Sequence, residues 1–555
     1  MQQKRWERFQ IRLVSPRHYM ADVEHEVALE DTDRIHGHTA LVRNVAAAVS
    51  LSNAVRSTLG PRGLDKMLVD ESGKATVTND GVTVLETARV EHPTANLLIA
   101  SSSSQDKSAR DGTTTTVILM AEMLQNALEL VRAGVHPSII TNGYRIANEK
   151  AVKELDLMAR LADSKQLKRS VVSTSLQGKI DSLLSSHLTE LALEAADALI
   201  DEEGGDDLER LRIKRLQISG GKALNTELLP ALVLAKTRVD KNTLSSSKNG
   251  KIAILDGSLE NKKLELEAEI EVNSLGVMKE FHERNNKYLQ KIINSLEHLG
   301  VELLIVRDGI ADEAIPILSK AGITAYRRFE RDDIERLSRI TGADIIRNLE
   351  KIEERHLGDY SSRSEENIGS INYTKIEGNL GGAMTVIFRG STPEIRDEVS
   401  RAFDDALGVS HRLSRENRIL PGGGATQTHL ARKLREFSTT QSGREQMAIE
   451  AYAAALEIVP RTLAKNAGYD PIDTLLSLSA AQSKDTKKGG WIGINGNSGE
   501  VMDMYDEGIF DPIFVAKHAI SGATDSAISV LRIDDVLWAK QGPETPDWSN
   551  QIDDN

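Results

Sequence analysis

The sequence of 555 residues contains no cysteine. This absence excludes disulfide bonds, zinc sites built from thiolates and a cysteine nucleophile. A chain without disulfides fits a reducing compartment, and we expect the protein to be cytoplasmic. Basic residues are also in the minority, because 69 Lys and Arg face 83 Asp and Glu and the net charge is -14. This balance argues against a general nucleic-acid binder, which carries a basic stripe.

Long hydrophobic runs are missing as well. The best candidate for a membrane span, residues 117–131, is short and contains Glu122 and Glu129. The first eight residues read Met-Gln-Gln-Lys-Arg-Trp-Glu-Arg and lack the apolar centre of a signal peptide. We therefore expect a soluble, intracellular protein that has no membrane partner and no nucleic-acid partner.

Three frequent catalytic motifs are also absent. The sequence has no Gly-x-x-x-x-Gly-Lys-Ser/Thr loop, no Gly-x-Gly-x-x-Gly loop and no His-Glu-x-x-His pair. An ordinary P-loop enzyme and a zinc hydrolase therefore have no support.

Residues 111–116 read Asp-Gly-Thr-Thr-Thr-Thr and stand directly before an apolar, helix-forming stretch. At a helix N-terminus, the unpaired N–H groups and the helix dipole favour phosphate. Gly112 allows the backbone to approach a ligand closely, and Asp111 can hold a hard cation such as Mg²⁺. The alternative is that the threonines only cap the helix, and the hexapeptide alone does not decide between the two.

The length of the chain exceeds what one hydrophobic core supports, so two to four domains are expected. Helical periodicity dominates both ends of the sequence. The middle alternates apolar strands at 251–255, 301–306 and 323–326 with helices, including a long charged helix at 278–298. This alternation predicts a partly parallel sheet. Helical ends around an α/β middle predict that the first and last portions of the chain build one domain together.

Local patterns add finer predictions. The Asn-Asp-Gly sequence at 79–81 is a turn signal and predicts a hairpin beside the strands 66–69 and 75–78. A single helix is expected at 83–100, and the four serines after it either continue this helix or form a tight turn. Residues 361–366 are polar and predict a loop. Gly220-Gly221 predicts a hinge, and the acidic residues 202–207 interrupt a helical pair.

Several motifs in a fixed order resemble the chaperonins. Taken singly, each is explained by a turn or a helix cap. Their combination over residues 35–540 resembles the group II chaperonins, which are the archaeal thermosome and the eukaryotic cytosolic type. The motifs stand at residues 58–68, 78–85, 91–95, 111–115, 421–425, 508–512 and 531–536.

The resemblance implies a mixed α and α/β multidomain fold, with a helical equatorial domain, an intermediate hinge domain and an α/β apical domain that carries a helical protrusion. The implied boundaries are an N-terminal extension at 1–38, an equatorial domain at 39–160 and 408–540, an intermediate domain at 161–218 and 372–407, an apical domain at 219–371 with a lid protrusion at about 269–299, and a mobile tail at 541–555.

The resemblance also implies the activity. A group II subunit hydrolyses ATP and encloses non-native client proteins in a double ring with other chaperonin subunits, as a homo- or hetero-oligomer. The implied cofactors are ATP and Mg²⁺, with K⁺ as a further candidate cation. Because the protrusion serves as a built-in lid, no separate lid co-chaperonin is expected.

Site residues follow from positions within the matching motifs. Asp111 matches the Mg²⁺ ligand, Asp405 matches the acid that orients and activates the attacking water, and Asp80 matches a second acid near that water. The positions that match phosphate contacts are Leu59, Gly60, Pro61, Gly112, Thr113, Thr114 and Thr115. The positions that match adenine and ribose contacts are Gly422, Gly423, Asn495 and Asp511. A carboxylate that orients water fits phosphoryl transfer, in which positioning and charge neutralisation dominate.

The sequence departs from the family pattern at three positions. Arg110 replaces the usual glycine before the Mg²⁺ ligand, where it is expected to clash or to contact phosphate. Asp404 replaces the usual histidine before Asp405, and Gln427 replaces a usual acid. These departures predict a divergent paralogue and leave an alternative open, namely a structural ring member that binds ATP but hydrolyses it weakly. A transferase unrelated to folding would require the ordered motifs to be coincidental.

Overall fold

The computed structural model describes residues 32–69, 73, 75–87, 92–199, 212–260, 275–368, 371–485 and 489–539. The chain divides into a small unit, residues 1–41 and 533–555, and a large unit, residues 42–532. In the small unit, β1 (Thr32–His36) pairs antiparallel with β19 (Asp535–Ala539). The helix α1 (Gly37–Arg56) starts directly after β1. The prediction of a weakly ordered extension at 1–38 is therefore wrong for residues 32–38, because residues 32–36 pair with a strand from the other end of the chain and residues 37–38 begin α1.

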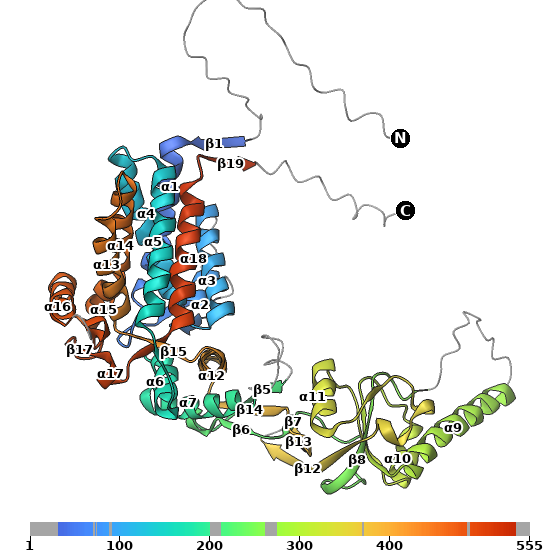
Figure 1. Cartoon of the computed structure of the whole chain (residues 1–555). Helices are drawn as coiled ribbons and strands as arrows, with labels where there is room; N and C mark the ends of the chain where they lie inside the picture. The colour runs from blue at the N-terminus through green and yellow to red at the C-terminus, as the bar shows by residue number, and fades with distance from the viewer. Residues whose placement is uncertain are drawn as a thin grey trace, which may run out of the picture. The chain divides into compact units, whose positions relative to one another are not determined.

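Helices from both ends of the chain pack together in the large unit. The α4 helix packs against α18 and α14, and α5 packs against α14 (Figure 1). Tyr144 of α5 meets Tyr452 of α14 edge-on at 5.4 Å, and the Tyr452 hydroxyl bonds the Thr524 hydroxyl of α18 at 2.8 Å. The helices are α2 (Gly81–Thr87), α3 (Pro93–Ala109), α4 (Thr113–Arg132), α5 (Pro137–Met158), α13 (Ala425–Ser438), α14 (Glu445–Leu456), α15 (Ile458–Ala467), α16 (Pro471–Lys484) and α18 (Ile513–Leu531).

Short strands close this helical region. The strand β2 (Lys66–Val69) forms a hairpin with β3 (Ala75–Thr78). The strand β15 (Arg418–Pro421) pairs with β4 (Arg160–Leu161) and with β18 (Phe510–Pro512), so it joins segments far apart in the sequence. The strand β16 (Ile492–Ile494) pairs with β17 (Val501–Asp503), which leads into α17 (Met504–Glu507).

A second region is built around the long helix α12 (Pro393–Arg415). It packs against α6 (Lys165–Leu176) and α7 (Ser182–Asp197), whose apolar faces share one core with it. The central strand beside it is β14 (Met384–Gly390), which is parallel to β5 (Ile213–Ser219) and antiparallel to β6 (Glu227–Leu229). Gly220 and Gly221 follow β5 with φ of 91° and 80°, a conformation that suits glycine.

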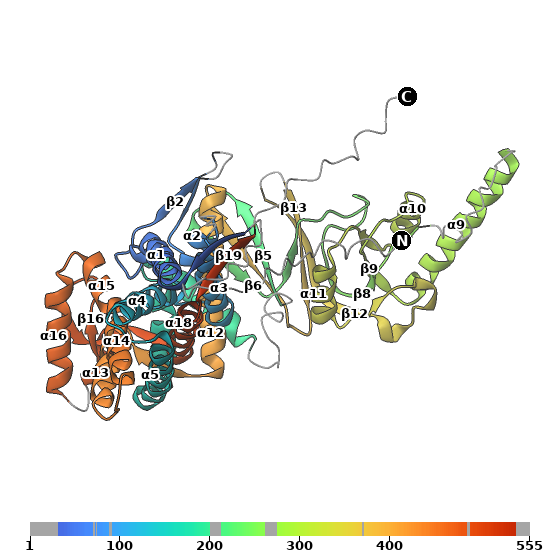
Figure 2. The same ribbon diagram turned by 90° about the horizontal axis from the view of Figure 1, so that it is seen from above.

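A seven-stranded mixed sheet forms the middle of the chain. Its parallel strands are β8 (Ser247–Leu255), β9 (Val301–Val306), β10 (Thr324–Tyr326) and β11 (Ile345–Ile346), and its antiparallel strands are β12 (Gly358–Ile368), β13 (Ile371–Gly378) and β7 (Leu232–Leu234). Ala253 and Leu255 face α9 (Leu275–His298) and α10 (Ala314–Lys320), whereas Ile252 and Ile254 face α11 (Arg331–Thr341), because successive side chains of a strand point to opposite faces. Figure 2 shows α11 on one side of β8 and β9 and the helices α9 and α10 on the other. The parallel pairing of β8 with β9 and β11, and of β9 with β10, confirms the predicted partly parallel sheet.

Three local predictions are corrected. Residues 361–366 lie within β12, where buried Arg363 donates to the Tyr326 hydroxyl at 3.0 Å and the Leu244 carbonyl at 2.7 Å, so polar residues are satisfied inside the sheet. The hairpin turn falls between β2 and β3, and residues 79–81 instead start a helix, since Asp80 Oδ2 accepts from the Thr83 N–H at 2.8 Å. The helix predicted at 83–100 is two helices, with Pro93 opening the second, and the serines at 101–104 continue it.

Some predictions lie outside the described residues. They are the extension at 1–31, the acidic interruption at 202–207, the start of the protrusion at 269–274 and the tail at 541–555. Within the described ranges, no helix combines the length and the hydropathy that crossing a bilayer requires.

Candidate active site

A pocket of about 200 Å³ lies where segments from both ends of the chain meet in the large unit. The starts of α2, α4 and α18 border it, together with the loop after α1 and the turn between α6 and α7. Among the predicted site residues, the structure brings together Leu59, Gly60, Pro61, Asp80, Asp111, Gly112, Thr113, Thr114, Thr115, Gly423 and Asp511 around this pocket. Asp405, Gly422 and Asn495 lie outside its lining.

The turn between α3 and α4 carries Asp111 and Gly112. Gly112 is the N-cap of α4, with φ of 78°, and it has no side chain that could accept a hydrogen bond. The Thr116 hydroxyl donates back to the Gly112 carbonyl at 3.0 Å, within the helix. The threonines therefore do not cap α4, and the first turn of the helix borders the pocket without a capping side chain.

Buried Gln105 holds this turn from behind. Its Nε2 donates to the Asp111 carbonyl at 2.7 Å and to the Val515 carbonyl at 3.3 Å, and its Oε1 bonds His518 Nδ1 at 2.6 Å. Gln105 thus ties the backbone of Asp111 to α18. Sequence reasoning missed Gln105, because its partners in α18 lie about 410 positions away and no local motif marks it.

The loop after α1 is fixed in the same manner. Asn466 of α15 donates to the Leu59 carbonyl at 2.8 Å and to the Arg56 carbonyl at 3.0 Å. Gly60 has φ of 88°, and a Cβ at this position would lie 2.5 Å from Leu463 Cδ2. Only glycine fits such a backbone at such a close approach.

Asp405 reaches the pocket through Lys179. Asp405 Oδ2 lies 2.7 Å from Lys179 Nζ, and Lys179 lines the pocket from the turn between α6 and α7. Burial lowers the pKa of Lys179, but Asp405 and Asp111 outweigh it and keep this amine charged. Burial raises the pKa of Asp405 to about 7, against the opposing effect of Lys179 and with Asp80 adding to the rise. The charges of Asp80, Asp111, Lys179 and Asp405 therefore act on one another beside the pocket.

Lys179 is the main residue that sequence reasoning missed. It stands in the short turn after α6 and follows Gly178, which has φ of 82°. A Gly-Lys pair between two predicted helices was the available signal, and it is weak because it is common in loops.

Of the remaining predicted residues, Asp511 lines the pocket, whereas Asn495 and Gly422 lie outside its lining. Burial and the neighbouring Asp111 raise the pKa of Asp511 to about 7. The Asn495 side chain is engaged in its own turn, where it accepts from the Asn497 N–H at 2.9 Å and donates to Glu507 at 2.9 Å. Gly422 allows β15 to approach Ile509, because a Cβ there would lie 2.8 Å from Ile509 Cγ2.

The side chains at the pocket supply only some of the ligands that a hard cation needs. Among the described residues, no three His, Cys, Asp or Glu side chains are grouped closely enough to hold a metal ion. Mg²⁺ is commonly bound by one or two carboxylates, with phosphate oxygens and water completing its octahedron. Asp111 beside a phosphate-favouring helix start suits that arrangement.

Comparison with known proteins decides the family. Residues 51–541 match the TCP-1/cpn60 chaperonin family. The chain belongs to this family. It is 39% identical to thermosome subunit 1 of Haloferax volcanii, covering 92% of this chain and 90% of the relative. It is 38% identical to the thermosome subunit of Methanocaldococcus jannaschii (94% and 96% covered) and 37% identical to thermosome subunit alpha of Thermoplasma acidophilum (93% and 94% covered). The protein is a group II chaperonin subunit with a multidomain group II fold.

Two of the three departures of this chaperonin subunit from the family pattern have partners away from the pocket. Arg110 adopts φ of 55°, its stem lies over Gly408 of α12, and its guanidinium is 3.8 Å from Asp106. Asp404 pairs with Arg215 of β5 at 2.7 Å. Gln427, in contrast, is buried and lines the pocket. The side chain of Arg110 is thus not among the groups that border the pocket.

Proposed function

We propose that this chaperonin subunit hydrolyses Mg²⁺-ATP in the pocket and that hydrolysis drives closure of a double-ring chamber around non-native proteins. The observation that carries the proposal is that the phosphate-favouring start of α4 and the Asp405–Lys179 pair, which are far apart in the sequence, meet at the pocket. Family membership supports ATP use in general, and the geometry supports hydrolysis by this chain.

The phosphates would be held by backbone and hydroxyl groups. The start of α4 offers N–H groups and the positive end of the helix dipole, and Thr113, Thr114 and Thr115 offer hydroxyl donors. Gly60 and Pro61 border the same space from the opposite side. Asp111 would hold Mg²⁺, which neutralises charge on the phosphates when bound. K⁺ stays a further candidate cation. Asp511 and Gly423 border the pocket and would contact the ribose and the adenine.

Asp405 would orient the attacking water and accept its proton. A carboxylate with a pKa of about 7 is a stronger base than an ordinary aspartate and is still largely ionised just above neutral pH. Lys179 holds Asp405 in place through the 2.7 Å ion pair and reduces repulsion from Asp80. Asp80 borders the pocket and would act as the second acid near the water.

The proposed domains are those expected from the resemblance, with an equatorial domain at 39–160 and 408–540, an intermediate domain at 161–218 and 372–407, and an apical domain at 219–371. The packing of α4 and α5 against α14 and α18 supports the equatorial assignment. Asp405 lies on α12, in the intermediate domain, so closure would move it toward the phosphates and couple hydrolysis to closure. The helix α9 would form part of the built-in lid.

The proposed partners are other subunits of a homo- or hetero-oligomeric double ring and non-native clients, without a separate lid co-chaperonin. We propose a cytoplasmic location, in keeping with a sequence free of cysteine.

The experiment is ATP turnover by the assembled protein, compared between the wild type and Asp405→Ala. Loss of an acid that orients water is expected to lower kcat by roughly a hundredfold or more. Glu398→Gln is the matched control, because Glu398 is another acid of α12 but pairs with Arg401 of the same helix. Near-background turnover in both the wild type and Asp405→Ala would reject this function and favour the weakly hydrolysing ring member.

A further inference from the structure

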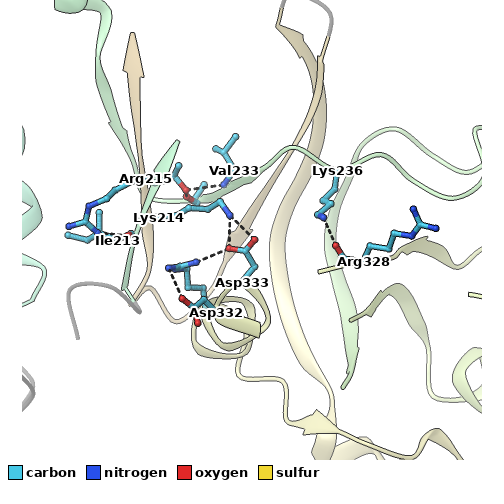
Figure 3. A network of polar contacts seen from close by, with 11 residues as sticks. Ile213, Lys214, Arg215, Val233, Lys236, Arg328, Asp332 and Asp333 are labelled. Carbon is cyan, nitrogen blue, oxygen red and sulfur yellow. Dashed lines mark hydrogen bonds and ion pairs between the residues drawn. The ribbon is translucent and has the colours of Figure 1, made fainter. Parts of the chain in front are cut away.

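The strand β5 presents its side chains to two different helices. Arg215 and Gln217 point toward α12, whereas Lys214, which directly precedes Arg215, points to α11 on the opposite face. Figure 3 shows Lys214 directed at Asp333 while Arg215 extends to the other side of the strand. Successive residues of a strand alternate in this manner, so a single strand contacts both helices.

On one face, β5 binds α12 at two points. Arg215 Nε lies 2.7 Å from Asp404 Oδ1, and Gln217 Nε2 donates to Asp397 Oδ1 at 2.8 Å. Asp397 and Asp404 are seven residues apart, which is about two helical turns, so they lie on the same face of α12. Two contacts along one face restrict rotation of the helix about its axis.

On the other face, β5 is anchored by a buried charge cluster. Lys214 Nζ lies 2.6 Å from both oxygens of Asp333, and Arg336 NH1 lies 2.8 Å from Asp333 Oδ1 (Figure 3). The Asp333 side chain is 3% exposed. β5 also pairs with β14 along its whole length, from Ile213 to Ser219. The strand that holds α12 is therefore fixed independently of α12.

Asp404, which pairs with Arg215, is the residue next to the catalytic candidate Asp405. Asp404 precedes Asp405, and the two side chains diverge by about 100° around the helix. Asp404 is held by Arg215 while Asp405 is held by Lys179 at the pocket. A rotation of α12 that broke the first pair would displace the second carboxylate.

We propose that Arg215 is a positioning residue for ATP hydrolysis, which acts through Asp404 to set the orientation of α12 and thus of Asp405. The inference rests on the proposed role of Asp405 in hydrolysis. A displacement of a reacting group by about 1 Å can cost roughly a hundredfold in rate, so even a small rotation of α12 matters. The pair also accounts for the aspartate at 404, where the family usually has histidine.

A charge swap tests the proposal on the assembled full-length protein. Arg215→Glu and Asp404→Arg are each expected to lower kcat by about fivefold, with the KM for ATP changed less than about twofold, as for loss of a partly exposed ion pair. The double variant restores an attractive pair and is expected to regain at least about half of the wild-type kcat. Should Arg215→Glu fail to assemble, Arg215→Gln takes its place, with an expected loss of about threefold.

Glu398→Gln is the control for this experiment. It removes the Glu398–Arg401 pair, which lies on the same helix and is comparably exposed, but which ties α12 only to itself. Its kcat is expected to stay within about 1.5-fold of the wild type, because surface ion pairs contribute little. A fivefold loss in this control would show that any charge change on α12 slows hydrolysis and would overturn the special role of Arg215.

The pH profile of kcat separates positioning from direct electrostatics. A loss of positioning lowers kcat at every pH and does not change the pH at which kcat is half of its plateau value. A direct effect of the charge at 404 on Asp405 shifts this midpoint pH. A moved midpoint without a lowered plateau overturns the proposal, as does a double variant that stays as slow as the singles. Wild-type kcat in the Arg215 variants, with activity lost in Asp405→Ala, overturns this inference alone. Wild-type kcat in Asp405→Ala overturns the proposed function itself.

Discussion

At Gly112 the backbone takes a left-handed conformation that L side chains rarely adopt. Its φ is 78°, and an added Cβ would lie 3.0 Å from Val515 Cγ1 and 3.1 Å from Gln105 Nε2. Gly112→Ala is expected to destabilise the fold by about 1–2 kcal/mol and to raise the KM for ATP, because both strain and crowding act at the start of α4. Thermal unfolding and steady-state ATP turnover measure the two effects.

Gly134→Ala is the matched control for Gly112→Ala. Gly134 follows α4 with φ of 85°, but nothing lies within 4 Å of an added Cβ. We expect a destabilisation of about 1 kcal/mol from strain and an unchanged KM. If Gly112→Ala bound ATP with the affinity of the wild type, this result would contradict the proposed close approach of the Gly112 backbone to the nucleotide.

The ionisation of Asp405 predicts how hydrolysis depends on pH. Burial raises the pKa of Asp405 to about 7, and only the ionised carboxylate can accept a proton. The kcat should therefore rise as the pH increases through about 7 and fall below it, while Lys179 stays charged throughout. The raised pKa also means that ionisation of Asp405 disfavours the folded state as the pH rises from about 4 to 7. A kcat that is constant from pH 6 to pH 8 would contradict a base with this pKa.

At the residue scale, the sequence predicts the site where chemistry and backbone geometry coincide locally. Asp111 and Gly112 stand in one short motif, so their pattern indicates a ligand site before any fold is known. Lys179 is different, because its partner Asp405 lies 226 residues away and only the folding of the chain brings them together. Residues whose role depends on such distant contacts carry no local signal.

At the scale of elements, hydrophobic periodicity predicts the helices and the buried strands well. It fails for β12, where residues 361–366 are polar because their partners are other polar groups in the sheet. Buried Arg363 is satisfied by Tyr326 and Leu244, which no local window of sequence includes. The turn signal at 79–81 is also wrong, since Asp80 fits a helix N-cap as well as a turn.

The cluster that anchors β5 to α11 gives a prediction for stability. Asp333→Ala leaves Lys214 and Arg336 without their shared carboxylate in a buried place and is expected to cost about 3 kcal/mol. Lys214→Ala is expected to cost less, about 1 kcal/mol, because Arg336 still pairs with Asp333. The midpoints of urea unfolding measure the difference. Equal effects of the two substitutions would show that the cluster does not depend on its central carboxylate.

Breaking an exposed ion pair provides the control for this cluster. Glu354→Ala removes the partner of Lys251, on the surface of the seven-stranded sheet. No measurable shift of the unfolding midpoint is expected, because solvent screens such pairs.

At the scale of the whole molecule, exposed apolar side chains indicate a surface that contacts partner subunits. Leu64, Met67 and Val69, in and beside β2, are each at least 64% exposed. Apolar groups gathered at the surface commonly mark contacts between proteins. We expect electron microscopy of the purified protein, alone or mixed with its paralogues, to show double rings, and Met67→Glu to weaken them. Monomers under all nucleotide conditions, with and without paralogues, would contradict a ring.

Helical ends around an α/β middle predict one domain built from both ends of the chain, and in the structure α4 and α5 pack against α14 and α18. The pairing of β1 with β19 was not expected, because each strand is short and neither carries a strong pattern. Pairing between chain ends depends on where the rest of the fold brings them, which local sequence does not encode.

The central claim is that Asp405 makes this chaperonin subunit hydrolyse ATP. The most direct measurement is the identity of the nucleotide recovered from assembled protein after incubation with ATP and Mg²⁺, in the wild type and in Asp405→Ala. We expect mostly ADP from the wild type and mostly unhydrolysed ATP, bound in similar amount, from the variant. Equal amounts of ADP from both proteins would contradict it.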